Sequence, residues 1–165
     1  MKIAVIFDAE TGAGGGYFQS LKSALLLKKL ENNSINFSYI TPHNQIFTKL
    51  KNEKLNTIFF KDILLTRIFY QLSQSYFCQI FLSLFKFKNP FVKFLKKNNF
   101  DFVIFLGPSW FIKVCDGYNF ISSTYDINFK LDNYFPEYES SRLFESKNLI
   151  VKKSVNRAFK ILVDT

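Results

Sequence analysis

The first 30 residues constrain the fold more than any other part of the chain. Residues 2–7, KIAVIF, are almost all apolar, and four of the six glycines follow within five positions of one another. Such a run is typical of a parallel strand that is covered on both faces. Residues 17–30 then carry Phe18, Leu21 and Ala24 at helical spacing. Strand, glycine turn and helix together predict an α/β fold.

The alternation continues to the end of the sequence. Further strands are expected over residues 35–40, 56–60, 100–108, 118–124 and 160–164, and helices over residues 63–85, 89–99 and 142–159. Apolar strands that alternate with helices predict a mostly parallel sheet with helices on both faces. Because there is no internal repeat or low-complexity linker, residues 1–165 are expected to form one Rossmann-like three-layer domain.

Cysteine and histidine usage argues against a metal site. Cys78 and Cys115 form no CxxC pair and have no histidine at ligand spacing. His43, the single histidine, has no Ser, Cys or acidic partner at a recognisable spacing, so no catalytic triad is expected either. Two isolated cysteines fit a reducing compartment, and the N-terminus lacks a secretory apolar region. The sequence therefore predicts a cytoplasmic protein.

Positive charge is concentrated in the first 100 residues. They hold 14 Lys and Arg against 5 Asp and Glu, whereas residues 101–165 hold eight of each. A basic face attracts nucleic acid, an anionic membrane or a phosphorylated substrate. Nucleic acid is not expected as a partner, because the basic residues are not interleaved with aromatic residues in any nucleic-acid motif.

The helix expected over residues 63–85 raises the question of a membrane span. Residues 68–85 carry no charge, and Leu65, Ile68 and Leu72 begin an apolar stripe. Three glutamines and three serines interrupt the segment, whereas a bilayer core requires about 20 predominantly apolar residues. A buried helix or a helix on the membrane surface is the better interpretation.

The glycine turn is the strongest candidate for a binding site. In a parallel α/β sheet, ligands bind beyond the carboxyl ends of the strands, and the start of a helix favours an anion such as phosphate. Gly14, Gly15 and Gly16 would let a ligand approach the backbone, with Tyr17 beside them. The turn is not a Walker A loop, and Tyr17 stands where GxGxxG needs its third glycine. The alternative is a flexible turn that is merely rich in glycine.

Two further strand ends would carry side chains to the same edge. Gly107, Ser109 and Trp110 follow one strand, and Tyr125 and Asp126 follow the next. Trp110 would either form a platform for substrate or pack beneath a loop. The Asp126 carboxylate would act as a base, bind a sugar hydroxyl or cap a turn.

The order of these parts resembles family 4 (group 1) glycosyltransferases of the GT-B fold. Four segments carry the resemblance, in order along the chain: MKIAVIFDAETGAGGGYFQSLKSALLLKKL, NPFVKFLKKNNFDFVIFLGP, ISSTYDINFKLDNYFPEY and RLFESKNLIVKKSVNRAFKILVDT. They are similar to the family's opening strand with its Gly-Gly loop and helix, its Asp-Phe-Val-Ile strand, its His-Asp loop, and its Arg-rich helix with the strand after it. Tyr125 stands where the family usually has His.

The resemblance implies a retaining transferase that moves a sugar from a nucleotide-sugar donor to a glycan or lipid-linked acceptor, as in cell-surface polysaccharide synthesis. It implies no metal or other cofactor. Residues 1–165 would form the acceptor-side domain, and a C-terminal donor-binding domain would be missing, so the chain alone is not expected to turn over. By position, Gly14, Gly15 and Gly16 match the loop that reaches the donor phosphates or the acceptor, and Asp126 matches the aspartate of His-Asp as a candidate catalytic residue.

Two alternatives remain open. A non-catalytic module that kept the fold would bind a partner or an anionic membrane surface, at the inner face of the membrane, through its basic portion and residues 63–85. A nucleotide-binding oxidoreductase would need an acidic residue about 20 positions after the glycines. The second expected strand ends SYITPHN, without an acid, so this alternative ranks last.

Overall fold

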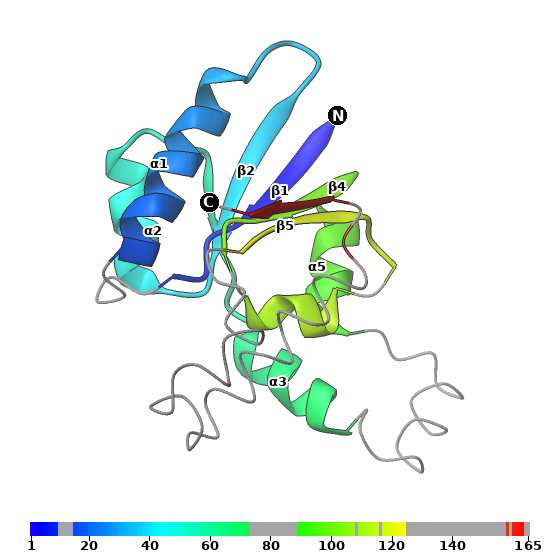
Figure 1. Ribbon diagram of the computed structural model, residues 1–165. Helices are drawn as coiled ribbons and strands as arrows, with labels where there is room; N and C mark the ends of the chain where they lie inside the picture. Colours follow the sequence, from blue (N-terminus) through cyan, green and yellow to red (C-terminus); the bar gives the residue numbers. More distant parts are fainter. Residues whose placement is uncertain are drawn as a thin grey trace, which may run out of the picture.

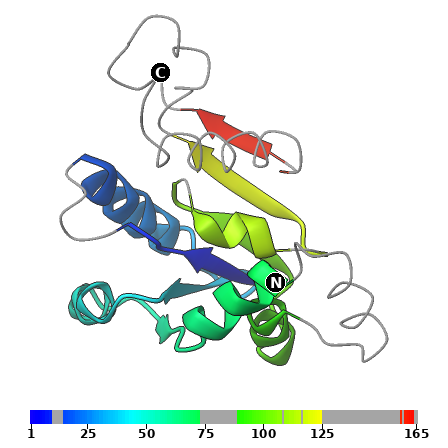
Figure 2. The same ribbon diagram turned by 90° about the horizontal axis from the view of Figure 1, so that it is seen from below.

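The computed structural model describes residues 1–9, 15–72, 89–107, 109–115, 117–124, 158 and 160–163. The described strands form a six-stranded sheet in the order β3-β2-β1-β4-β5-β6, and every neighbouring pair is parallel. They are β1 (Lys2–Ile6), β2 (Asn36–Thr41), β3 (Thr57–Phe59), β4 (Phe102–Phe105), β5 (Phe120–Thr124) and β6 (Lys160–Val163). Figure 2 shows β6 beside β5 at one end of the sheet. This is the strand order of a Rossmann-like fold, so the predicted fold class is confirmed.

Helices cover both faces of the sheet and complete three layers. The described helices are α1 (Gly15–Lys29), α2 (Asn44–Asn52), α3 (Ile63–Leu72), α5 (Pro90–Lys97) and the 3-10 helix η1 (Trp110–Val114). One core joins α1 and α2 to the sheet, and the other joins α3, α5 and η1 to its opposite face. Figure 1 shows the two groups of helices on opposite sides of the strands.

β1 lies in the middle of the sheet because its side chains are apolar in both directions. Ala4 and Ile6 are buried in the core on the α5 side, whereas Ile3 and Val5 are buried in the core on the α1 side. The strand pairs with β2 on one side and with β4 on the other. The near-continuous apolar run at the start of the sequence thus predicts its position as well as its conformation.

Phenylalanine side chains make up much of the core on the α5 side. The Phe60 ring, just after β3, lies 5.4 Å from Phe91, 5.2 Å from Phe94 and 5.5 Å from Phe111, measured between ring centroids. All three contacts are edge-to-face, which is a favoured arrangement for aromatic pairs. Phe60 therefore joins the end of β3 to α5 and to η1.

The buried face of α1 differs from the one expected. Tyr17, Ser20 and Ala24 are buried, whereas the Phe18 side chain is 69% exposed. The expected stripe was wrong at Phe18 because a polar residue, Ser20, occupies the inner face. Its hydroxyl donates to the carbonyl oxygen of Leu106 at 2.5 Å, so the buried hydroxyl has a hydrogen-bond partner.

The remaining differences concern the helices. The sequence pattern did not predict α2, a short helix with only Ile46 and Leu50 buried. Of the helix expected over residues 63–85, the structure describes α3; the rest, and the helix expected over residues 142–159, lie outside the described residues. Among the described residues, no helix combines the length and the apolar character needed to cross a bilayer.

Candidate functional site

The loops that follow β1, β2 and β4 meet at the carboxylate of Asp8. Its Oδ2 accepts a hydrogen bond from the Ser109 hydroxyl at 2.8 Å and another from the backbone N–H of Trp110 at 3.3 Å. Its Oδ1 lies 3.3 Å from Nε2 of His43. Asp8 follows β1, which is paired with β4. Since chain connections run in opposite directions from these two strands, this is the topological switch point where parallel α/β sheets bind ligands.

Local structure holds the partners of Asp8 in place. His43 occupies the N-cap position of α2, and its backbone N–H donates to the Thr41 hydroxyl at 3.2 Å. Ser109 occupies the N-cap position of η1, and its hydroxyl accepts from the N–H of Phe111 at 3.2 Å. The one Ser109 hydroxyl therefore caps η1 as an acceptor and binds Asp8 as a donor.

Gly107 explains how the chain turns from β4 toward Ser109. Its φ of 145° lies in a region that residues with a side chain rarely adopt. At this edge Gly107 redirects the backbone that carries Ser109. Its expected part in substrate binding stays a prediction.

Asp8 and His43 remain accessible while they contact each other. Their side chains are 17% and 29% exposed, whereas Ser109 is buried. A carboxylate accepts hydrogen bonds, and an imidazole can donate or accept, so the pair can bind a hydroxyl group. The carboxylate stands between the serine and the histidine. This order differs from that of hydrolytic triads, in which histidine contacts the serine directly, and it favours binding over nucleophilic attack.

Neither the backbone conformation nor the packing requires glycine at the start of α1. Gly15 and Gly16 do not have a positive φ, and a Cβ built on either would meet nothing within 4 Å. Alanine would fit both positions and would favour the helix. Among the described residues, neither backbone conformation nor packing therefore explains glycine at these two positions, and their expected part in ligand binding stays a prediction. Gly14, the third predicted glycine, lies outside the described residues.

Tyr17 and Trp110 use their rings for packing. Tyr17 is buried, with its ring 5.9 Å from that of Phe7, and burial followed by the charge of Glu53 raises the pKa of its hydroxyl. The Trp110 indole lies 5.5 Å from the Tyr70 ring and 5.9 Å from the Arg67 guanidinium, both on α3. Of the two interpretations of Trp110, the packed side chain agrees with these contacts.

The predicted residues Tyr125 and Asp126 lie outside the described residues. The strand before them, β5, ends at Thr124 and is parallel to β4. Its carboxyl end therefore reaches the same edge of the sheet as the ends of β1 and β4, where Asp8 and Ser109 lie.

Sequence reasoning missed Asp8 and set His43 aside. The rule that selected Asp126, an acid directly after an apolar strand, applies equally to Asp8. His43 lacks an acidic partner at sequence spacing, and the fold supplies one through the pairing of β1 with β2. Once the order of the strands is known, residues that follow neighbouring strands can be predicted to contact each other.

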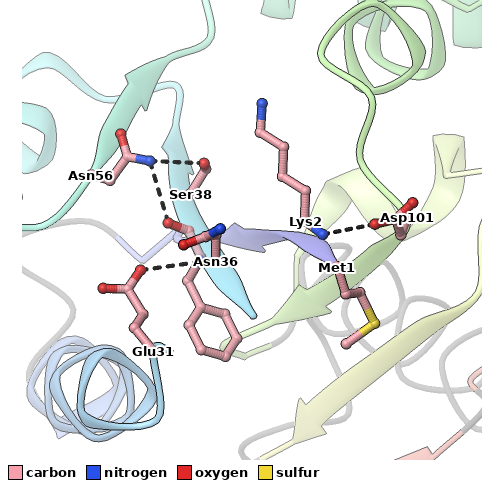
Figure 3. Close-up of a pocket in the computed structure, with 8 residues that line it drawn as sticks. Met1, Lys2, Glu31, Asn36, Ser38, Asn56 and Asp101 are labelled. Carbon is pink, nitrogen blue, oxygen red and sulfur yellow. Dashed lines mark hydrogen bonds between the residues drawn. The ribbon is translucent and has the colours of Figure 1, made fainter. Parts of the chain in front are cut away.

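A hollow lies at the edge of the sheet opposite to Asp8. It has a volume of about 450 Å³, and its lining residues are Met1, Lys2, Glu31, Asn36, Phe37, Ser38, Asn56 and Asp101. Figure 3 shows that polar groups of its wall bind one another: Asp101 accepts from the Lys2 N–H at 2.7 Å, and Asn56 donates to Ser38 Oγ at 3.0 Å. These bonds tie the amino ends of the strands together. The hollow is far from the carboxyl edge where ligands of such sheets bind.

Within the described ranges, no group of three His, Cys, Asp or Glu residues is placed to hold a metal ion. Comparisons with protein-family models, with curated proteins and with solved structures give no match to this chain. The strand order and the layers define the class of protein, which is a Rossmann-like α/β domain.

Proposed function

We propose that this chain is the acceptor-side domain of a retaining GT-B glycosyltransferase. It would hold a glycan or lipid-linked acceptor while a sugar is transferred from a nucleotide-sugar donor, in cell-surface polysaccharide synthesis. The donor would be bound mainly by a second domain, in cis or in trans. The enzyme would work in the cytoplasm, at the inner face of the membrane. The contact of Asp8 with His43 and Ser109 at the switch point carries this proposal.

The chemistry of this site suits a sugar hydroxyl. The Asp8 carboxylate is already held by two donors, Ser109 and Trp110, and its accessible side can accept a further hydrogen bond. The His43 side chain is 29% exposed and contacts Asp8, so it would help to orient a ligand bound there. Because these polar groups are already held in place, they can orient a hydroxyl ligand at little entropic cost.

The start of α1 supplies a place for a negative charge. Gly15 and Gly16 leave open space next to the first N–H groups of a 15-residue helix, and its first turn contains no acid. Helix N-termini favour phosphate groups through these N–H groups and the helix dipole. In the proposed enzyme, this position faces a phosphate of the donor or of a lipid-linked acceptor.

A nuclear magnetic resonance titration of the full chain tests the proposal. Isotope-labelled protein is titrated separately with oligosaccharides, UDP-glucose and NAD⁺. We expect the saccharide to shift the backbone amides of Ser109, Trp110 and Gly16. If NAD⁺ alone binds, or if the shifts map to Lys2, Asn56 and the amino edge, the proposal is wrong.

Two aspartates provide a matched pair of variants for this titration. Asp8→Asn removes the charge at the carboxyl edge, and Asp101→Asn removes one at the amino edge. Asp8 joins two loops, and Asp101 joins a loop to β1, each through hydrogen bonds. Asp8→Asn is expected to weaken saccharide binding about tenfold, in line with the loss of one charged hydrogen bond, and Asp101→Asn is expected to leave it unchanged.

A further inference from the structure

Helix α3 is apolar on two opposite sides. Its inner side packs against the core through Ile63, Thr66 and Tyr70. Its outer side carries four large aliphatic side chains that are between 46% and 68% exposed: Leu64, Leu65, Ile68 and Leu72. At about 100° per residue, these four fall within an arc of about 100°, opposite the inner side. We call this set the outer face of α3. A helix at the surface of a domain normally presents polar residues there.

Helices α3 and α5, which pack against each other, carry several basic residues and few acidic ones. Lys61, one turn before Leu64 and Leu65, and Arg67 on the flank of the helix are both exposed. The helix that packs against α3, α5, adds the exposed lysines Lys93, Lys96 and Lys97. Across residues 61–72 and 89–97 the sequence has a single acid, Asp62. Figure 1 shows α3 below the other labelled helices, and α3 is in contact with α5.

Aliphatic side chains with basic residues around them match one kind of surface best. An amphipathic helix of this composition lies in the interface of a bilayer, with its apolar face at the acyl boundary. Lysines and arginine beside it are attracted to anionic headgroups. If a second copy of the chain bound here instead, the basic residues of the two copies would lie close together. Their electrostatic repulsion would oppose the contact.

We propose that the outer face of α3 docks this protein onto an anionic lipid bilayer. Leu64, Leu65, Ile68 and Leu72 enter the interface, and the exposed lysines of α5 are attracted to the anionic headgroups. The inference rests on the membrane location in the proposed function and names the surface that binds there. Docking does not require sugar transfer, so vesicle binding and saccharide binding can fail independently.

Contacts on the inner side of α3 connect this surface to the Asp8 site. Tyr70 of α3 packs against Trp110, and the Trp110 N–H donates to Asp8. One residue therefore separates the docking helix from the site carboxylate. This short connection between the docking helix and the site suits a lipid-linked substrate, whose anchor would lie in the same bilayer.

Sedimentation of the full chain with lipid vesicles tests the docking surface. The vesicles contain phosphatidylcholine alone or phosphatidylcholine mixed with phosphatidylglycerol. We expect at least about tenfold more binding to the anionic vesicles at low ionic strength, and a loss of this preference in high salt. Equal binding to both kinds of vesicle would overturn the proposal.

Two double variants separate the outer face of α3 from general apolar exposure. L65Q/I68Q removes two side chains of the outer face, and L26Q/L30Q removes two exposed leucines of the region around α1. Glutamine favours helices, and all four positions are exposed, so both variants should keep native circular dichroism. We expect L65Q/I68Q to lower vesicle binding about tenfold and L26Q/L30Q to leave it unchanged. If both bind like the wild type, or if L65Q/I68Q instead dissociates a dimer, membrane docking by α3 is excluded.

Discussion

The Asp8 carboxylate accepts a hydrogen bond from the Ser109 hydroxyl at 2.8 Å and so ties the loop after β1 to the loop after β4. These strands are neighbours in the sheet although their loops are distant in sequence. The bond is partly buried, and its acceptor is charged, which makes it stronger than an ordinary hydrogen bond. The same contact therefore stabilises the edge of the sheet and positions the carboxylate for a ligand.

Ser109→Ala removes this hydrogen bond and the cap on the N–H of Phe111. We expect the free energy of unfolding to fall by about 2–3 kcal/mol, as measured by urea denaturation. A double-mutant cycle with Asp8→Ala, which removes the acceptor, should give a coupling energy of about 1 kcal/mol or more. Additive effects of the two substitutions would show that the hydroxyl and the carboxylate do not interact.

Two glycine substitutions should change stability in opposite directions. A Cβ at Gly16 or at Gly117 would meet nothing within 4 Å, but only Gly117 has a positive φ, 79°. Gly16→Ala is expected to leave stability unchanged or raise it by up to about 1 kcal/mol. Gly117→Ala is expected to lower it by about 1 kcal/mol, because alanine is strained in that conformation. Urea midpoints of the two variants measure the difference.

Gly16→Ala also tests the proposed ligand position. A methyl group there occupies the open space at the start of α1, so saccharide or nucleotide-sugar binding should weaken while the fold is kept. The titration described for the wild type provides the measurement. Unchanged affinity for every ligand that binds the wild type would show that the ligand does not approach this turn.

Tyr39 should make the protein sensitive to alkaline pH. Its hydroxyl donates to the carbonyl oxygen of Ala24 at 2.8 Å, and burial, followed by the charge of Glu31, raises its pKa. In the unfolded chain the tyrosine hydroxyl ionises near its ordinary pKa of 10.0, while in the folded protein Tyr39 stays protonated. Its contribution to stability is therefore fully present below that pH and is lost as the pH rises above it.

Tyr39→Phe provides the comparison. At neutral pH the variant should be about 1 kcal/mol less stable, because the hydrogen bond to Ala24 is lost. Its stability should then decline less than that of the wild type as the pH rises above about 10. Thermal unfolding in a series of buffers measures both effects, and parallel pH profiles would contradict the prediction.

Phe60 is expected to be costly to remove, because its ring contacts three other rings of the core. Phe60→Ala would leave a cavity between Phe91, Phe94 and Phe111, and we expect a loss of about 3–5 kcal/mol in the free energy of unfolding. Phe18→Ala removes a ring that is 69% exposed and should change stability by about 0.5 kcal/mol or less. Similar losses in both variants would argue against the described core.

The strands were predictable because each is a local pattern. An apolar run such as residues 2–7 identifies a buried strand wherever its partners lie. The inner sides of the helices were harder to predict. Ser20 is buried because a carbonyl oxygen of another element accepts its hydrogen bond, and no local pattern contains that information. In α3, the apolar stripe that begins at Leu65 faces outward, since Ile63, Thr66 and Tyr70 fill the inner side.

The candidate site was only partly predictable for the same reason. Chain position places Gly16 and Ser109 at the carboxyl edge of the sheet, because every parallel strand ends there. The contact between Asp8 and His43 depends on the pairing of β1 with β2, and the contact between Asp8 and Ser109 depends on the pairing of β1 with β4. Strand order decides both contacts, and a single sequence does not encode it in any short motif.

Trp110 is the only tryptophan in the chain, and it packs on Tyr70 while its backbone N–H binds Asp8. Its intrinsic fluorescence therefore samples the junction between the docking helix and the candidate site without any label. Vesicles and soluble saccharides can be added to the unmodified protein in either order. A change in the Trp110 emission spectrum will show whether binding to the vesicle alters binding of the saccharide, or the reverse.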